Sequence, residues 1–373
     1  MFPRRVIDAV VGEALLPSLR AARCVRWRGD QGCRACEVAC PHRALWLDPR
    51  GSWHLDASAC DGCGACASAC PSQAIDAPGV DADAMRRAWR GAERVTLGCA
   101  RSEGQADVRV PCLAGIHPEA FATSLLRHPD TTVVLDLSAC PGCAAGALRP
   151  VIEAQARQAR DYARLAGAPA DVRVTGRAEV APERAMDRRA FFRLARERTA
   201  SFVAERLAQD GAAGASVSLP HRPALLGAVR ARQAETHPTV PPPGPVMLPV
   251  LAAWYVDWHV SDACDGCAAE SRARCVAACP NGAWRVGRPH GRAALTHDAA
   301  TCSGCGACER ACPHSALAAR PAPLAADAGR QAKRTLAESV CRSCRHAPAR
   351  GPDGLCRHCR TRIDLAERSR PGV

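Results

Sequence analysis

The sequence predicts an α+β protein in which two small cysteine-rich modules flank a small α/β domain, with a pair of Cys-x2-Cys knuckles in the tail. Cysteine supplies 24 of the 373 residues, and 20 of these cysteines fall in dense blocks within residues 24–70, 264–312 and 341–359. Between the first two blocks, apolar strands alternate with helical stretches, which is the pattern of α/β domains. With only 5 Phe and 2 Tyr, aromatic core is scarce, so bound metal is expected to stabilise part of the fold.

Composition and motif positions divide the chain into five parts. The sharpest boundary is the proline-rich stretch at residues 237–245, which predicts a stiff extended linker. The five predicted parts are a first module (1–80), an α/β domain with four cysteines (81–180), a helix and linker (181–250), a second module (251–320) and a four-cysteine tail (321–373).

One cysteine run occurs twice with the same spacing. Residues 60–71 read C-x2-C-x2-C-x3-C-P, and residues 302–313 repeat this pattern, each copy with an aspartate four positions ahead, Asp56 and Asp298. Glycines between the first three cysteines allow the positive φ values that a tight loop around a compact cluster needs. The alternatives for such spacing are a zinc site or a disulfide knot. Both aspartates are expected to form turns or caps.

Each run has a companion upstream. Residues 24–41 read C-x8-C-x2-C-x3-C-P, and residues 264–280 read C-x2-C-x7-C-x3-C-P. All four runs are followed by the same phrase, in which the proline precedes two variable residues, an alanine and a large apolar residue. This phrase predicts a short strand that returns over the metal site.

The paired runs resemble the two-cluster bacterial ferredoxins, in which the fourth cysteine of each run ligates the cluster of the other run. The resemblance implies four [4Fe–4S] clusters, held by Cys24, Cys33, Cys36 and Cys70; by Cys60, Cys63, Cys66 and Cys40; by Cys264, Cys267, Cys275 and Cys312; and by Cys302, Cys305, Cys308 and Cys279. The long spacing between Cys24 and Cys33 departs from the family pattern. Without Cys24 as a ligand, the first cluster would hold three irons.

The region between the modules predicts strands at residues 93–97, 108–112, 131–137 and 171–175, and helices at 118–127 and 147–165. Its four cysteines, Cys99, Cys112, Cys140 and Cys143, lie at strand ends, where open α/β sheets place their sites.

Residues 110–121, followed by an apolar strand and a Cys-x2-Cys pair, resemble the small iron–sulfur subunit of viologen-reducing hydrogenase and heterodisulfide reductase complexes. The cysteine spacing also resembles thioredoxin-like [2Fe–2S] ferredoxins, although that family usually has three residues within the last pair. Either resemblance implies a [2Fe–2S] cluster at these cysteines. The alternatives are a zinc site and a Cys140–Cys143 redox dithiol.

The tail pattern Cys341-x2-Cys344-x11-Cys356-x2-Cys359 resembles a short zinc ribbon and predicts structural zinc, with rubredoxin-like iron or another cluster as the alternative. The formal charge of +13 is expected to balance the metal sites, because four oxidised cubanes at about −2 each leave about +5 and two further four-cysteine sites leave about +1. Nearly all of the positive charge is arginine and it is spread along the chain, which disfavours nucleic-acid binding.

These features predict a multi-cluster electron-transfer protein, a ferredoxin-like subunit that relays single electrons between oxidoreductase partners and is not itself an enzyme. No glycine-rich dinucleotide motif, P-loop or catalytic triad is visible in the sequence. The rival hypotheses are a disulfide reductase that uses Cys140 and Cys143, and a redox-sensing regulator. No apolar run reaches about 18 residues, so no membrane span is expected, and thiolate-dependent sites predict a reducing, cytoplasmic location. We expect roughly 16 to 18 irons and one zinc per chain.

Overall fold

The structure is a computed structural model, and the part of the chain that it describes contains all 24 cysteines. The described residues are 16–30, 32–48, 50–79, 82–176, 221–236, 247–248, 256–267, 273–287, 289, 292–320, 324–325, 329–336, 341–344 and 354–368. The helix predicted in the third part of the chain, at residues 182–209, lies outside them, and so does the proline-rich linker. The chain divides into two compact units: unit 1 is residues 1–24 and 32–244, and unit 2 is residues 25–31 and 245–373.

The cysteine-rich part of unit 1 is built from short elements. Two antiparallel pairs form here: β1 (Ser18–Leu19) with β4 (Ile75–Asp76), and β2 (Leu45–Leu47) with β3 (Trp53–Leu55). The helices α2 (Ala35–Ala39) and α3 (Ala65–Ser68) each carry a cysteine of the two runs. Both predicted return strands are therefore present, as β2 and β4.

A four-stranded sheet forms the centre of unit 1. Its order is β6-β5-β7-β8 and every neighbouring pair is parallel. The strands are β5 (Arg94–Cys99), β6 (Val108–Val110), β7 (Thr132–Asp136) and β8 (Asp171–Thr175). All four lie within a residue or two of their predicted positions, so the α/β character is confirmed, while the thioredoxin-like alternative stays a prediction.

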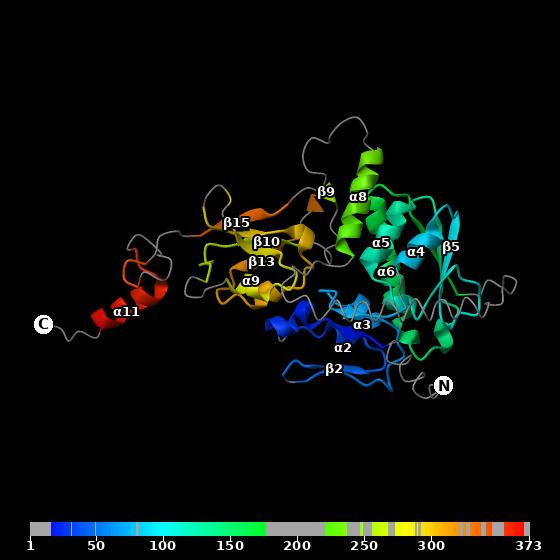
Figure 1. Cartoon of the computed structure of the whole chain (residues 1–373), viewed down its shortest axis with the longest axis horizontal. Helices are drawn as coiled ribbons and strands as arrows, with labels where there is room; N and C mark the ends of the chain where they lie inside the picture. Colours follow the sequence, from blue (N-terminus) through cyan, green and yellow to red (C-terminus); the bar gives the residue numbers. More distant parts are fainter. Residues whose placement is uncertain are drawn as a thin grey trace, which may run out of the picture. The chain divides into compact units, whose positions relative to one another are not determined.

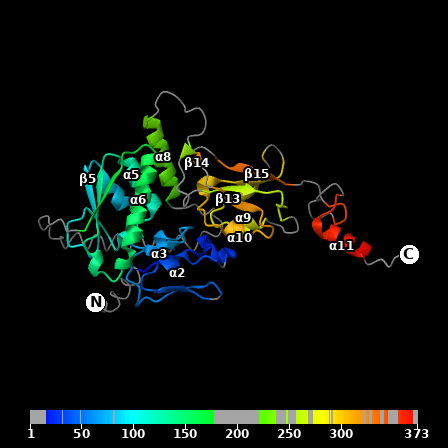
Figure 2. The ribbon, with the colours of Figure 1, turned by 180° about the vertical axis from the view of Figure 1, so that it is seen from behind.

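Helices pack together beside this sheet (Figures 1 and 2). They are α4 (Ala82–Trp89), α5 (Pro118–Arg127), α6 (Arg149–Leu165) and α8 (Arg222–Thr236). Helix α5 contacts both α6 and α8 and is buried on most of its surface, which explains why it is apolar on several faces. It begins at the predicted proline, and the His117 side chain accepts a hydrogen bond from the Glu119 N–H at its start.

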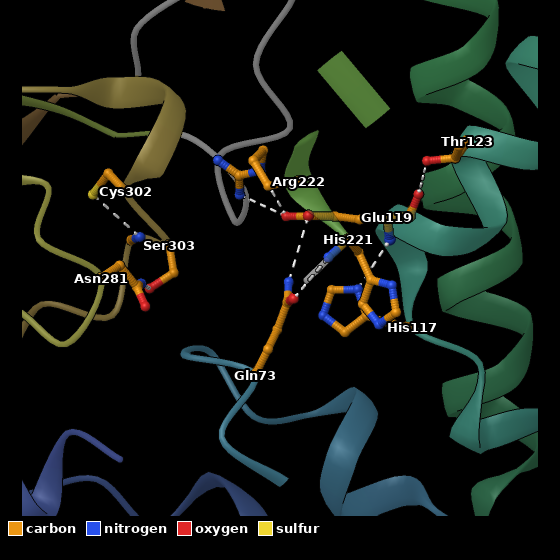
Figure 3. A network of polar contacts seen from close by, with 10 residues as sticks. Gln73, His117, Glu119, Thr123, His221, Arg222, Asn281, Cys302 and Ser303 are labelled. Atoms are coloured by element: carbon orange, nitrogen blue, oxygen red, sulfur yellow. Dashed lines mark hydrogen bonds and ion pairs between the residues drawn. The ribbon is translucent and has the colours of Figure 1, made fainter. Parts of the chain in front are cut away.

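A buried polar network joins α5, α8 and the first module (Figure 3). Arg222 donates to Glu119 Oε1 from Nε at 3.0 Å and from Nη2 at 2.5 Å, and the two side chains are only 3% and 4% exposed. Gln73 donates to Glu119 at 3.4 Å and accepts from the His221 N–H at 3.2 Å. The His117 and His221 rings stack with their centroids 4.8 Å apart. Because buried charges require partners, this network specifies how α8 docks.

Unit 2 repeats the short antiparallel pairs of the first module. Strand β10 (Asp257–Val260) pairs with β13 (Leu317–Arg320), and β11 (Trp284–Gly287) pairs with β12 (Ala294–His297). Its remaining elements are η2 (Arg26–Arg28), β9 (Met247–Leu248), α9 (Arg274–Ala278), η7 (Ala299–Thr301), α10 (Ala307–Arg310), β14 (Leu324–Ala325), β15 (Gln331–Thr335) and α11 (Arg357–Arg368). Across the described residues of both units, every helix is too short or too polar to cross a bilayer.

Glu119→Gln should loosen α8, because it removes the buried carboxylate that pairs with Arg222. Breaking a buried pair costs about 3 kcal/mol, and we expect amide hydrogen exchange in α8 to quicken roughly 100-fold. Glu235→Gln is the matched control, since its pair with Arg232 lies on the same helix and Glu235 is 66% exposed. Equal exchange in both variants would contradict a stabilising role for the buried pair.

Acid should weaken the same region at unusually mild pH. Burial lowers the pKa of His117 from 6.5 to about 3, and burial also lowers the pKa of His221. Below about pH 6.5 the unfolded chain therefore binds protons that the folded chain does not, and stability falls as the pH falls. Hydrogen exchange of α5 and α8, corrected for the intrinsic rate, should accelerate between pH 6.5 and 5. The dependence should be weaker in His117→Asn, which keeps a helix cap; an unchanged profile would count against this origin.

Candidate metal centres

The fourth cysteine of each run is followed by a left-handed turn. The residue three positions later has positive φ in all four runs: 52° at Arg43, 51° at Gln73, 64° at Gly282 and 45° at Ser315. This turn points the next backbone N–H back at the cysteine sulfur. Ala74 donates to Cys70 Sγ at 3.2 Å, Ala283 to Cys279 Sγ at 3.3 Å, and Ala316 to Cys312 Sγ at 3.3 Å. In these three runs, the alanine of the repeated phrase therefore donates a hydrogen bond to the cysteine sulfur and also leads into the strand.

The cysteines of the first module gather in two sets. Burial raises the pKa of Cys36 to about 12, with further contributions from Cys70, Cys33, Cys66 and Cys24. Burial also raises the pKa of the Cys66 thiol to about 12, and the neighbouring thiols Cys60 and Cys40 add to this shift. The fourth cysteine of each run thus lies near the companion run, Cys70 near Cys36 and Cys40 near Cys66, as the exchange that the ferredoxin resemblance implies would require, while Cys66 is near both groups.

The second module shows the same exchange. A small cavity is lined by Cys264, Cys267, Cys275 and Cys312, together with Asp265 and His314 among others. Burial raises the pKa of Cys302 to about 11, and Cys279 and Cys305 contribute to the shift. Cys308 likewise has a raised pKa, through burial and through Cys302, Cys305 and Cys279.

A histidine and an aspartate link the runs in both modules. His42, two residues after Cys40, contacts Asp61 at 2.9 Å within the second run. His314, two residues after Cys312, contacts Asp265 at 3.0 Å within the first run of its module. Each pair ties a fourth cysteine to the loop of the run whose cluster it would share. These contacts were not predicted from the sequence, although the Cys-Pro-His and Cys-Asp-Gly-Cys segments are visible in both modules.

The four central cysteines come together at the carboxyl edge of the parallel sheet. Cys99 ends β5, Cys112 follows β6, and Cys140 and Cys143 flank a 3-10 turn after β7. Burial raises the pKa of Cys112 to about 11, and the contributing thiols are Cys99, Cys140 and Cys143. Polar groups surround these sulfurs: Arg101 Nη1 donates to Cys143 at 3.7 Å and Ser102 Oγ donates to Cys99 at 3.5 Å.

This central set adjoins the first module within unit 1. Burial raises the pKa of Cys63 to about 12, and Cys112 is among the neighbouring groups that add to the shift. A Cβ on Gly64 would lie 3.2 Å from Gly115 Cα, and Ser68 Oγ donates to the Ala114 carbonyl at 2.5 Å. The loops that carry Cys63 and Cys112 are therefore in direct contact.

The tail cysteines form a different kind of group. The ligand atoms of Cys341, Cys344, Cys356 and Cys359 all lie within 4.8 Å of one another, and Cys344 Sγ is 3.8 Å from Cys356 Sγ. A tetrahedral ion with metal–sulfur bonds of about 2.3 Å places its sulfurs about 3.8 Å apart. The arrangement fits one ion rather than a cluster, because a cubane's four thiolates bind four separate irons. His346 lies outside the described residues, and the exposed His358 is not in this group.

The donor sets fit metal in every case. The structure pairs none of the 24 cysteines in a disulfide, and buried thiols with raised pKa values stay protonated until a cation offsets the cost of the thiolate. When bound, iron–sulfur clusters supply reversible one-electron redox chemistry, and zinc supplies a structural cross-link. The loop aspartates Asp56 and Asp298 cap the backbone before each second run, as predicted.

The family model for the 4Fe-4S dicluster domain matches residues 31–74 and 263–316. Two regions of the chain are therefore similar to this domain. The two dicluster domains support the ferredoxin resemblance, [4Fe–4S] clusters and an iron–sulfur role in electron transfer. The second match contains all eight cysteines of its module, whereas the first begins after Cys24. No curated protein and no solved structure matches the chain.

Because of the left-handed turn, glycine at the positive-φ position should make the domain more stable, which is the opposite of its usual effect. Ser315 is exposed and has a φ of 45°, which costs an L-residue about 1–2 kcal/mol, so Ser315→Gly should stabilise the second dicluster domain by about 1 kcal/mol. Gly282→Ala, at the same position of the companion run, should destabilise it by a similar amount. The urea concentration at which cluster absorbance is lost measures both effects, and shifts of the same sign would contradict the turn's role.

Proposed function

We propose that this chain is a multi-cluster electron relay that carries four [4Fe–4S] clusters in its two dicluster domains. The single observation that supports it most is that the fourth cysteine of each run lies near a cysteine of the companion run: Cys70 near Cys36, Cys40 near Cys66, Cys312 near Cys275 and Cys279 near Cys302. The proposed ligands are the four sets implied by the ferredoxin resemblance. Cys24 belongs to the first set, because it contributes to the pKa shift of Cys36 although it precedes the family match.

The central cysteines hold a [2Fe–2S] cluster in this proposal. Cys99, Cys112, Cys140 and Cys143 lie at one sheet edge, and hydrogen bonds from Arg101 and Ser102 to sulfur stabilise added negative charge. The contact between the Cys63 and Cys112 loops makes the cubane of Cys40, Cys60, Cys63 and Cys66 its nearest neighbour within unit 1.

The tail holds one structural zinc ion, bound by Cys341, Cys344, Cys356 and Cys359. Its role is to close a small fold next to α11, since zinc has no redox chemistry and its four positions are filled by protein. The chain then relays single electrons from a donor protein to an acceptor protein within an oxidoreductase complex. No bond to a substrate forms in this step: one centre is oxidised as the next is reduced.

Cys112→Ala should remove about two of roughly 18 irons and leave the zinc in place. Clusters on touching loops interact magnetically, so the low-temperature EPR spectrum of the reduced wild-type protein should show broadening that the variant loses. Cys341→Ala is the matched control, which should lose zinc and keep both the iron and the broadening. Full iron content in the Cys112 variant, or identical spectra, would refute the central cluster.

The rival function is a dithiol reductase that uses Cys140 and Cys143. Arg101 Nη1 donates to Cys143 Sγ at 3.7 Å, but burial raises the pKa of Cys140, which disfavours a nucleophile at Cys140. Iodoacetamide treatment of the reduced, iron-loaded protein separates the two hypotheses. Cluster ligands stay unlabelled, whereas a redox dithiol is alkylated at one or both cysteines.

A further inference from the structure

Two buried tryptophans of unit 2 have indole N–H groups without a hydrogen-bond acceptor. Trp258 on β10 is 2% exposed and Trp284 on β11 is 1% exposed, and within the described part of the chain neither Nε1 has a hydrogen-bond partner. A buried donor that stays unsatisfied costs about 1–3 kcal/mol, so an acceptor absent from the polypeptide is expected at each position.

Both indoles face the same set of cysteines. Trp258 and Trp284 share one buried core with Cys302 and Cys308. The indole of Trp258 lies close enough to Cys302 to oppose the rise of its pKa, and that of Trp284 does the same for Cys308. The two indoles come from different sheets, because β10 pairs with β13 whereas β11 pairs with β12. They therefore reach one site from two directions.

The first dicluster domain has no tryptophan at either of these two positions. In the return phrases, Leu45 holds the position of Trp284. Strand register gives the second comparison: Val260 pairs with Leu317 as Leu19 pairs with Ile75, which places Pro17 at the position of Trp258. Leucine and proline have no side-chain N–H to offer at these places.

The first domain has an indole at another position. Trp53 on β3 packs on the core that contains Cys66 and Cys70, and its buried Nε1 also has no partner among the described residues. The two domains thus place their indole donors at different positions.

We propose that Trp258 and Trp284 donate indole hydrogen bonds to the cluster held by Cys279, Cys302, Cys305 and Cys308, and raise its reduction potential. The inference rests on the proposed function, since it requires a cubane at these cysteines. Reduction adds one negative charge to the cluster, and fixed N–H donors in a buried site stabilise the reduced form more than the oxidised form.

The ring of Trp284 is held in place by a neighbour. His297 lies opposite Trp284 in the β11–β12 register, and their ring centroids are 4.6 Å apart. Burial lowers the pKa of His297 to about 4, so it is neutral at physiological pH and packs against the indole without adding charge. Trp258 and Trp284 are positioning residues in this scheme, because they act on the potential through hydrogen bonds and do not ligate iron.

Phenylalanine keeps an aromatic ring and removes the donor. In EPR-monitored redox titrations, Trp258→Phe and Trp284→Phe should each shift one cubane to a more negative midpoint potential, and the double variant should shift it further. Iron and sulfide content should stay at the wild-type level. Trp89→Phe is the control, since Trp89 is also buried with an unpartnered N–H but lies on α4, edge-on to Phe121.

Unchanged potentials with full iron content would overturn the inference and leave the indoles as packing groups. If a phenylalanine variant loses iron, 3-benzothienylalanine at the same position keeps the two-ring shape and replaces only the N–H by sulfur. An unchanged potential in that protein would be equally decisive against the proposal. Failure of the proposed function looks different, because the wild-type protein would then contain no cubane to titrate.

Discussion

A left-handed residue placed three positions after each fourth cysteine is the constraint on which both dicluster domains depend. It turns the chain so that the next N–H faces the sulfur, and it starts the strand that covers the site. Without the turn, a thiolate would lose a donor and the return strands β2, β4, β11 and β13 would start in another direction. Backbone strain at Arg43, Gln73 and Ser315 is tolerated because the fold and the metal site both need this geometry.

The turn also illustrates which features could be predicted from the sequence and which depend on tertiary packing. Cysteine spacing, the alanine phrase and the strand–helix order are local, and from them the runs, the return strands and the central elements such as α5 could be predicted. Contacts between different cysteine runs could not be predicted from the sequence, because they depend on which loops pack together. The His42–Asp61 and His314–Asp265 pairs and the approach of Gly64 to Gly115 are all of this kind.

Under the proposed function, the cysteines serve two physical purposes. In the modules and at the central sheet edge, burial raises the pKa values of thiols such as Cys36, Cys112 and Cys302, so a bound cation is needed to stabilise their thiolates, and iron would supply redox chemistry there. In the tail, four sulfurs converge within 4.8 Å, which suits a single ion that closes a fold. The many arginines spread along the chain would then supply counter-charge to the proposed anionic centres.

The central claim is that cubane clusters occupy the dicluster domains, and Mössbauer spectroscopy of anaerobically purified, ⁵⁷Fe-labelled protein tests it most directly. We predict a spectrum dominated by oxidised [4Fe–4S] clusters, which account for about 16 of roughly 18 irons, with a minor [2Fe–2S] component. A folded protein whose spectrum shows little iron, or only isolated ferric or ferrous ions in tetrahedral sulfur sites, would contradict the claim.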